Sequence, residues 1–192
     1  MPDISNDAHS DADIVRYDVH TSSLGHVLIA VSTSGVCAIL FGDDGAALQK
    51  ELRRRFARAT LGPPNEFSRR LATSVLALIE TQGVETPPLD FRGTDFQKRV
   101  WRALLGVPAG ATISYKELAS RAGTPGAIRA VAGACAANPL AFIVPCHRVV
   151  RNNGEISGYR WGVARKQALL KREGALAGDA KTIGARLAPG LG

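Results

Sequence analysis

A change of pattern near residue 91 divides this sequence of 192 residues into two unlike parts. Residues 1–90 carry 8 basic and 12 acidic side chains, a net charge of −4, whereas residues 91–192 carry 16 and 5, a net charge of +11. A segment at 82–92 with two consecutive prolines separates the parts. We therefore expect two domains, at 14–90 and 91–175, between a disordered leader at 1–13 and a flexible tail at 176–192.

The first part has the pattern of an α/β domain with a small antiparallel sheet. β-branched runs at 14–19, 27–31 and 36–41 are separated by turn-forming residues, which is typical of a three-stranded meander. Apolar residues at helical spacing then predict helices at 46–58 and 68–81.

The second part is predicted to be mostly helical. Thr94 and Gln97 fit a capping box that opens a helix to about residue 105, and Ser114 and Glu117 fit a second one, with a helix that stops at Gly123. The pair 124–125, threonine then proline, predicts the start of a third helix that runs to about residue 137. A short helix, a tight turn and a second helix are typical of a helix-turn-helix unit.

The charge and composition of this second part leave two interpretations open. A net charge of +11 fits either a polyanionic partner or a solvated basic face, and charge alone favours neither. The helix at 125–137 consists largely of alanine and glycine. Such a helix packs closely against another helix or enters a narrow groove, and composition alone favours packing.

Several classes of protein do not fit the sequence. No apolar run approaches the roughly 18 residues that span a bilayer, and the polar, acidic first residues are unlike a secretory signal. Cys37, Cys135 and Cys146 are too few and too scattered for a disulfide framework, so we expect a cytoplasmic protein with free thiols. No CxxC pair occurs and the four histidines lack metal-ligand spacing, so we expect no zinc or other metal.

Cys146 and His147 are the strongest candidates for chemistry. An apolar run, 139–145, delivers them through a proline bend. A cysteine is a strong nucleophile only as a thiolate, which a neighbouring base can stabilise. Adjacent residues on a strand point to opposite sides, so a bridging water or a twist at Pro145 would have to link the two. Cys37 and Cys135 have no such neighbours and are expected in the core.

The segment Pro145-Cys146-His147-Arg148-Val149-Val150 resembles the signature of the O6-alkylguanine-DNA alkyltransferase family. Blocks at 96–101, 114–115, 129–131 and 157–162 stand in the family's order and spacing. The resemblance extends from about Arg16 to Glu173 and is closest to the C-terminal half of the bacterial adaptive-response members. Five blocks in register do not arise by chance as a single hexapeptide can.

This resemblance implies both a fold and an activity. The fold would be an RNase-H-like N-terminal domain followed by an α-rich winged helix-turn-helix domain. The activity would be repair of duplex DNA by base flipping and transfer of a methyl or alkyl group from O6 of guanine to Cys146, with O4 of thymine left open as a second substrate. Each monomer would act once, in the minor groove, without cofactor or obligate protein partner.

The resemblance also implies roles for individual residues. Cys146 would accept the alkyl group, with His147 as its base through a water and Glu173 orienting His147. Tyr115 would donate a proton to the leaving guanine, and Asn138 would hold the segment of Cys146. Contacts to DNA or to the flipped base would come from Arg129, Ala130, Gly133, Tyr115, Ser157, Tyr159 and Arg160, and contacts to phosphates from Lys98, Arg99, Arg121 and Arg151.

Two departures from the family pattern and two rival functions remain. Arg160 and Trp161 are larger than the residues of some members, which predicts a narrower pocket for bulky adducts. The four-cysteine zinc module of the adaptive-response members has no counterpart in the sequence, so phosphotriester repair and transcriptional activation are not expected. The rivals are a DNA-binding module or lesion sensor without transfer, which the presence of Cys146 disfavours, and a cysteine hydrolase built on Cys146 and His147.

Overall fold

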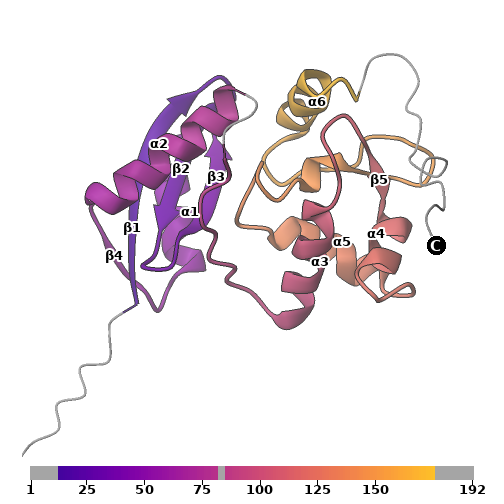
Figure 1. Ribbon diagram of the computed structural model, residues 1–192, viewed down its shortest axis with the longest axis horizontal. Helices are drawn as coiled ribbons and strands as arrows, with labels where there is room; N and C mark the ends of the chain where they lie inside the picture. The colour runs from indigo at the N-terminus through magenta and orange to yellow at the C-terminus, as the bar shows by residue number, and fades with distance from the viewer. Residues whose placement is uncertain (1–12, 82–84, 176–192) are drawn as a thin grey trace, which may run out of the picture.

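The computed structural model describes residues 13–81 and 85–175 and has a sheet-based N-terminal part and a helical C-terminal part (Figure 1). The predicted leader, apart from Asp13, and the predicted tail lie outside the described residues. Within the described ranges, no helix has the length and apolar character needed to cross a membrane.

The predicted meander forms, but the sheet has a fourth strand and is mixed. Strands β1 (Ile14–Ser22), β2 (Gly25–Val31) and β3 (Val36–Gly42) pair antiparallel, with Asp18 opposite Ile29 and Ile29 opposite Ile39. Strand β4 (Thr60–Gly62) pairs parallel with β1, which gives the order β3-β2-β1-β4. The expectation of a purely antiparallel sheet was therefore wrong. A strand of three residues is too short to show an alternating pattern in the sequence.

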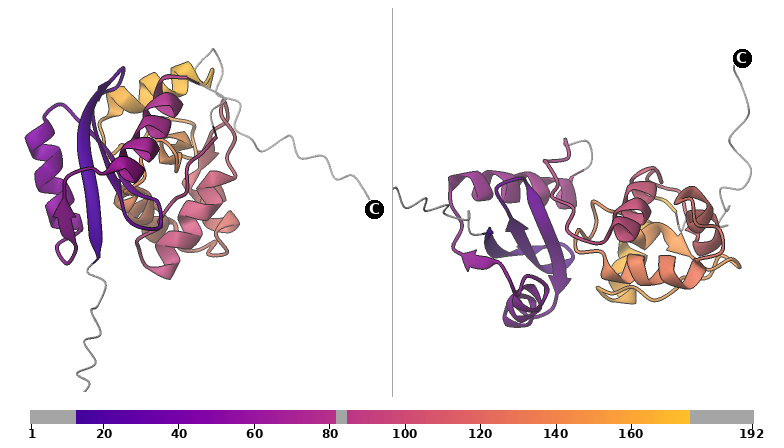
Figure 2. Two further views of the ribbon diagram at one scale, coloured as in Figure 1. Left: turned by 60° about the vertical axis from the view of Figure 1, so that its left-hand side comes forward. Right: turned by 90° about the horizontal axis from the view of Figure 1, so that it is seen from below.

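Helices α1 (Gly45–Arg55) and α2 (Glu66–Glu80) lie on opposite faces of this sheet, as Figure 2 shows. The α1 helix packs on β2 and β3, and α2 packs on β1 and β2. Every residue of 27–31 and 36–41 is accordingly buried, as expected for strands covered on both faces. Asp44 caps α1 by accepting from two backbone amides, and Asn65 and Ser68 form a capping box at α2.

In the C-terminal part, three helices pack pairwise around a core that contains Val100, Trp101 and Leu104. The indole of Trp101 donates to the carbonyl of Ala134, 2.8 Å away, and so fastens the first of these helices to the third. The elements are α3 (Asp95–Leu105), β5 (Ile113–Ser114), α4 (Tyr115–Arg121), α5 (Ile128–Ala137), the 3-10 helix η1 (Cys146–Arg148), β6 (Val149–Val150), which pairs parallel with β5, and α6 (Val163–Arg172).

The helix starts of this part were predicted with mixed success. The capping box of Thr94 and Gln97 is confirmed. At α4 one of the two expected hydrogen bonds of the capping box forms: the Ser114 side chain accepts from the Glu117 amide at 3.1 Å. The predicted start of α5 at Thr124 was wrong. Backbone bonds from Thr124 to Ala119 and from Ala127 to Thr124 make 124–127 a turn, and α5 begins after it.

The edge of β3 joins the two parts directly. Residues 88–90 pair with this edge through Val36, which donates to the Pro88 carbonyl at 2.8 Å and accepts from the Asp90 amide at 2.9 Å. Farther along, Ile39 donates to the Pro139 carbonyl at 2.8 Å and accepts from the Ala141 amide at 3.1 Å. An otherwise open sheet edge is thus occupied by the segment that leads to Cys146.

Candidate active site

Cys146 lies at the start of η1, where the chain leaves the edge of β3 and turns through Pro145. Its amide donates to the Val144 carbonyl at 2.8 Å, and the Arg148 amide donates to that of Pro145 at 3.0 Å. The local structure is therefore a tight turn and not the strand assumed from the apolar run. Cys146 is buried but not sealed, since 7% of its surface is exposed.

The side chain of Asn138 holds this turn in place. It is 1% exposed and caps the C-terminus of α5. Its Nδ2 donates to the Val144 carbonyl at 2.9 Å and to the Sγ of Cys146 at 3.2 Å, while its Oδ1 accepts from the Leu140 amide at 2.9 Å. One amide thus connects the helix end, the approach segment and the sulfur.

His147 and Arg148 share the carboxylate of Glu173. The Nε2 of His147 lies 2.8 Å from one carboxylate oxygen of Glu173, and Arg148 donates to both oxygens at 2.8 and 2.9 Å. Burial raises the pKa of Glu173, but the bonds from His147 and Arg148 outweigh it and bring the pKa to about 2. An ionised carboxylate accepts from Nε2–H, so the lone pair of a neutral imidazole stands on Nδ1, which is buried without a protein partner among the described residues.

Burial also sets the resting protonation of the reactive pair. It raises the pKa of the Cys146 thiol, against the opposing effects of the Asn138 hydrogen bond and the charge of Lys166. It lowers the pKa of His147, against the opposing effect of Glu173. The free protein therefore holds a protonated thiol beside a neutral imidazole. No direct hydrogen bond joins the two residues within the described part of the chain.

A second polar chain runs from Tyr115 through Ser157 to Lys166. The Tyr115 hydroxyl lies 2.9 Å from the Oγ of Ser157, and Lys166 donates to that oxygen at 3.0 Å and to the Val149 carbonyl at 2.5 Å. Lys166 is fully buried, which lowers its pKa to about 8. Burial likewise raises the pKa of Tyr115.

Aromatic rings surround His147. The ring of Phe142 stacks at 6.4 Å, and that of Tyr159 meets it edge-on at 6.5 Å. Phe142 has a φ of 71°, a left-handed conformation that side chains other than glycine rarely adopt. Strain of this kind persists where packing enforces it, often beside functional groups.

The structure thus places the Asn138 amide on the sulfur of Cys146 and pairs the adjacent His147 with Glu173. Comparison with known proteins shows the family of the chain. Residues 95–175 match the family model described as "6-O-methylguanine DNA methyltransferase, DNA binding domain". Over 160 residues the chain is 51% identical to the "Bifunctional transcriptional activator/DNA repair enzyme Ada" of Escherichia coli (strain K12), covering 83% of this chain and 45% of that protein. It is 43% identical over 124 residues to a methylated-DNA–protein-cysteine methyltransferase of Salmonella typhimurium, covering 63% of this chain and 70% of the relative.

A solved structure extends the likeness to both parts of the fold. The Mycobacterium tuberculosis O6-methylguanine methyltransferase is 36% identical, with a TM-score of 0.66 and coverage of 84% of this chain and 93% of that one; its structure in complex with DNA has a TM-score of 0.62. The chain belongs to the methylated-DNA–protein-cysteine methyltransferase family. It spans just under half the length of the first curated relative.

In this member of the family, the buried face of α5 differs from the face with the smallest residues. Val131, Ala134 and Cys135 are buried against the core. Arg129, Ala130 and Gly133 are exposed, and a Cβ added at Gly133 would meet no atom within 4 Å. Helix packing, the interpretation favoured by composition, therefore accounts for only part of the small-residue pattern.

The remaining predicted contact residues lie in the loop after β6. Ser157 is buried, Tyr159 is half-buried, and Arg160 directs its guanidinium to Glu51 of α1 and to the Ala136 carbonyl. Of the expected phosphate-binding residues, Lys98 is half-buried and Arg99 exposed, whereas Arg121 and Arg151 form exposed pairs with Glu117 and Glu155.

Sequence reasoning missed Lys166, although a signal existed. Lysine is treated as exposed by default, yet Lys166 shares the apolar face of α6 with Leu169 and Leu170, three and four residues on. The assignment of Cys37 to the core is confirmed: it is buried, and burial raises its pKa to about 12. Cys135 is buried in the same way. No cluster of three or more His, Cys, Asp or Glu side chains suited to a metal ion occurs in the described ranges.

Proposed function

We propose that this chain repairs alkylated duplex DNA by transferring a methyl or alkyl group from O6 of guanine to the sulfur of Cys146, once per molecule. The observation that carries the proposal is the environment of the Cys146 sulfur. The sulfur accepts a hydrogen bond from the Asn138 amide at 3.2 Å, and the next residue in the sequence, His147, is paired with Glu173. Such a cluster can stabilise a thiolate during the reaction. The proposed substrate, O6-alkylguanine in DNA, is taken from the family to which the chain belongs.

Proton transfer comes first in this mechanism. The Nδ1 of neutral His147 takes the thiol proton through a bridging water, and the resulting imidazolium is stabilised by ionised Glu173. The nearby charge of Lys166 and the Asn138 amide favour the thiolate. Burial disfavours the thiolate, so these two contacts and the proton transfer to His147 offset that cost when the thiol reacts.

Alkyl transfer is an SN2 displacement at carbon. The S–C bond forms as the C–O6 bond breaks, and the electron pair stays on guanine. Tyr115 donates its proton to the leaving base and is itself supported by Ser157 and Lys166. The product thioether has no good leaving group, so each molecule acts once and needs no cofactor.

Binding of duplex DNA follows from the exposed face of α5. In this proposal, α4, the turn and α5 act as a helix-turn-helix within a winged-helix domain at 91–175. Ala130 and Gly133 let the helix enter a minor groove about 6 Å wide. Arg129 fills the gap left by the flipped nucleotide, which offsets part of the few kcal/mol that flipping costs.

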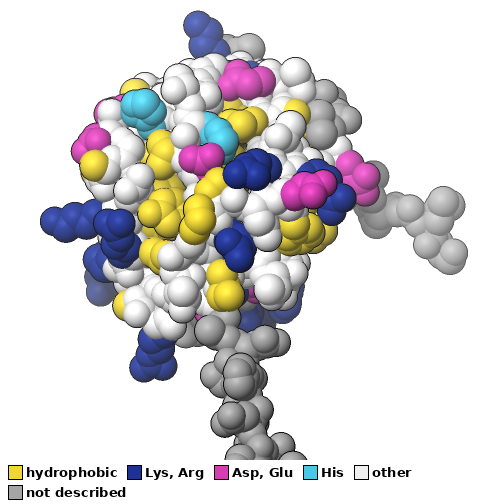
Figure 3. Space-filling view, turned by 90° about the vertical axis from the view of Figure 1, so that its left-hand side faces the viewer, with side chains coloured by type: hydrophobic (Ala, Val, Ile, Leu, Met, Phe, Trp, Pro, Cys, Tyr) yellow, Lys and Arg dark blue, Asp and Glu magenta, His cyan; other side chains and the backbone are white. Residues whose placement is uncertain are grey.

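The charge distribution favours contact of DNA with the C-terminal part, because residues 91–192 carry a net charge of +11 and residues 1–90 carry −4. The face presented by the N-terminal part shows apolar side chains near its middle, histidine and acidic side chains above them, and basic side chains mainly along its left and lower-left edge (Figure 3). We assign residues 14–90 to an RNase-H-like scaffold that supports its neighbour. The protein would act in the cytoplasm as a monomer, with O4-methylthymine as a possible second substrate.

The test is the stoichiometry of transfer from duplex DNA that carries labelled O6-methylguanine. The proposal predicts one equivalent of label on the protein and none after Cys146→Ala. Tight binding without transfer would instead support a lesion sensor. Repeated turnover of an ester or peptide, lost in the same variant, would support a cysteine hydrolase.

A further inference from the structure

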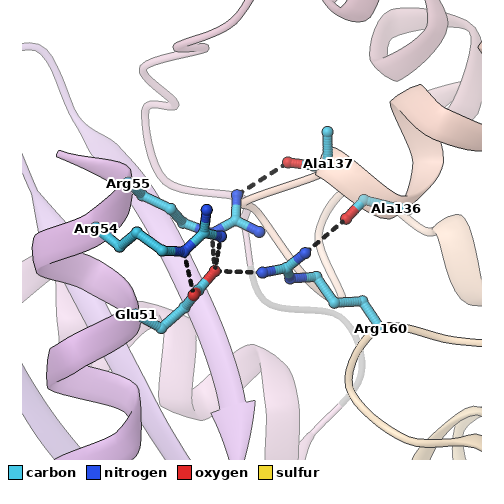
Figure 4. Close-up of polar contacts among 6 residues, drawn as sticks. All are labelled: Glu51, Arg54, Arg55, Ala136, Ala137 and Arg160. Atoms are coloured by element: carbon cyan, nitrogen blue, oxygen red, sulfur yellow. Dashed lines mark hydrogen bonds and ion pairs between the residues drawn. The ribbon is translucent and has the colours of Figure 1, made fainter.

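Glu51 of α1 connects the two parts of the chain through arginines (Figure 4). It accepts from Arg54 through both oxygens at 3.0 Å and from the Nε of Arg55 at 2.7 Å, within its own helix. Its Oε1 also pairs with Arg160, 109 residues later, in the loop that follows β6. One carboxylate therefore holds a guanidinium from each part.

Both guanidinium groups continue to the C-terminal end of α5. Arg55 donates to the Ala137 carbonyl at 3.0 Å, and Arg160 donates to the Ala136 carbonyl at 3.5 Å. Carbonyls of the last helical turn have no partner within their helix and attract cations. The next residue along the chain is Asn138, whose amide reaches Sγ of Cys146.

The same two arginines enclose part of the loop that carries Tyr159. Their guanidinium carbons lie 5.8 Å (Arg55) and 5.4 Å (Arg160) from the centre of the Trp161 ring, which is 6% exposed. Cations at this distance over an indole are attracted to its face. The carboxylate between them offsets their mutual repulsion and keeps both in place.

Glu51 is only partly exposed, with 21% of its side chain accessible. Burial raises its pKa, but the hydrogen bonds from Arg54 and Arg55 and the charge of Arg160 lower it to about 2. The carboxylate is therefore ionised at neutral pH. Its removal would leave Arg55 and Arg160 close together without an anion between them.

We propose that Glu51 is a positioning residue for alkyl transfer: through Arg55 and Arg160 it fixes the end of α5 and the loop around Tyr159, and hence the distance between the acceptor sulfur and a bound base. This role deepens the proposed function and rests on it. The N-terminal part then contributes to the geometry of the site, although it holds none of the reacting groups.

The test compares Glu51→Gln with Glu66→Gln, which removes the same charge from an exposed position in the same part of the chain. The single-turnover rate with saturating protein should fall about tenfold in Glu51→Gln, because displacements of about 1 Å at a reacting centre cost up to about a hundredfold. Duplex affinity should stay unchanged, and Glu66→Gln should react as the unsubstituted chain does.

A double-mutant cycle then asks whether Glu51 acts through Arg160. Adding Arg160→Gln to Glu51→Gln should cause much less loss than the two single effects combined, as for residues in one network. If Glu51→Gln does not fold, Glu51→Asp serves instead. It keeps the charge, but its shorter side chain cannot bridge both arginines, so its rate should fall as well.

An unchanged transfer rate in the folded variant, or a loss confined to DNA affinity or to urea stability, would overturn the positioning role. Additive effects in the cycle would also contradict it. Absence of transfer by the unsubstituted chain would instead refute the proposed function, so the two failures are distinguishable.

Discussion

Glu173, at the end of α6, holds His147 and Arg148 with a single carboxylate, whose oxygens lie 2.8 Å from the imidazole Nε2 and 2.8 and 2.9 Å from two guanidinium nitrogens. The side chains of His147 and Glu173 are 0% and 7% exposed. The last turn of the final described helix thus fixes the orientation of the base beside Cys146.

Replacing this carboxylate should affect both rate and stability. Glu173→Gln removes the charge that stabilises a protonated His147 and leaves Arg148 without its anion. We expect transfer to slow about a hundredfold, within the usual contribution of acid–base catalysis. The free energy of unfolding in urea should fall by about 3 kcal/mol, the usual cost of breaking a buried pair. Glu155→Gln, which breaks only an exposed pair with Arg151, should change neither quantity appreciably.

The lowered pKa of Glu173 predicts that the folded chain loses stability in acid. The pKa of Glu173 is about 2 in the folded chain, below its ordinary value of 4.5. A lowered pKa gives stability that is fully present above about pH 4.5 and is lost as the pH falls toward 2. Urea midpoints measured across this window should therefore fall more steeply for the unsubstituted chain than for Glu173→Gln. If the urea midpoints of the unsubstituted chain and of Glu173→Gln fell in parallel with pH, Glu173 would not contribute to stability as proposed.

Lys166 should be important although its hydrogen bonds go to Ser157 and Val149 and not to Cys146. Lys166→Met keeps the packing of α6 but removes the donor to Ser157 and Val149, so we expect transfer to slow about tenfold through the weakened support of Tyr115. Lys171→Met, at an exposed position of the same helix, is the matched control. An equal rate in both variants would rule out the role of the buried lysine.

The lowered pKa of Lys166 also predicts that its contribution to stability increases at alkaline pH. Its folded pKa of about 8 lies below the ordinary 10.5, so the unfolded chain binds more protons between these values, and the contribution of Lys166 to stability rises with pH over that window. Lys166→Met should lack this rise, which urea unfolding at pH 8 and pH 10 can detect.

The exposed face of α5 allows DNA binding to be tested apart from folding. Gly133→Leu adds a side chain where the protein has free space and should stabilise the helix by about 0.5–1 kcal/mol. Its affinity for duplex DNA should fall at least about tenfold because the helix no longer fits a narrow groove. Undiminished affinity, measured by titration of labelled duplex, would contradict docking through this face.

The sequence alone singled out Cys146 and His147 because they are neighbours in the chain, whereas Glu173, Tyr115 and Asn138 were assigned only through the family resemblance. The signature names Cys146 and His147 together, and the capping box at Thr94 is a contact three residues long. Such features need no knowledge of the fold. Lys166 required one further step, since a lysine on the apolar face of a helix is noticeable only when that face is assumed to be buried.

Features that depend on long-range pairing were missed. Strand β4 gains its identity only from pairing with β1, and Glu51 meets Arg160 only because the edge of β3 brings the two parts together. The misplaced start of α5 has a different cause. Thr124 was assigned a helix cap from its type, but its backbone is engaged in a turn with Ala119 and Ala127.

The most direct test of the account is mass spectrometry of peptides from the chain after reaction with duplex DNA that contains O6-methylguanine. The account predicts one added methyl group, on the peptide that contains Cys146, with the same result in Cys37→Ala and Cys135→Ala. An unmodified Cys146 beside consumed lesions, or a methyl group on either other cysteine, would contradict it.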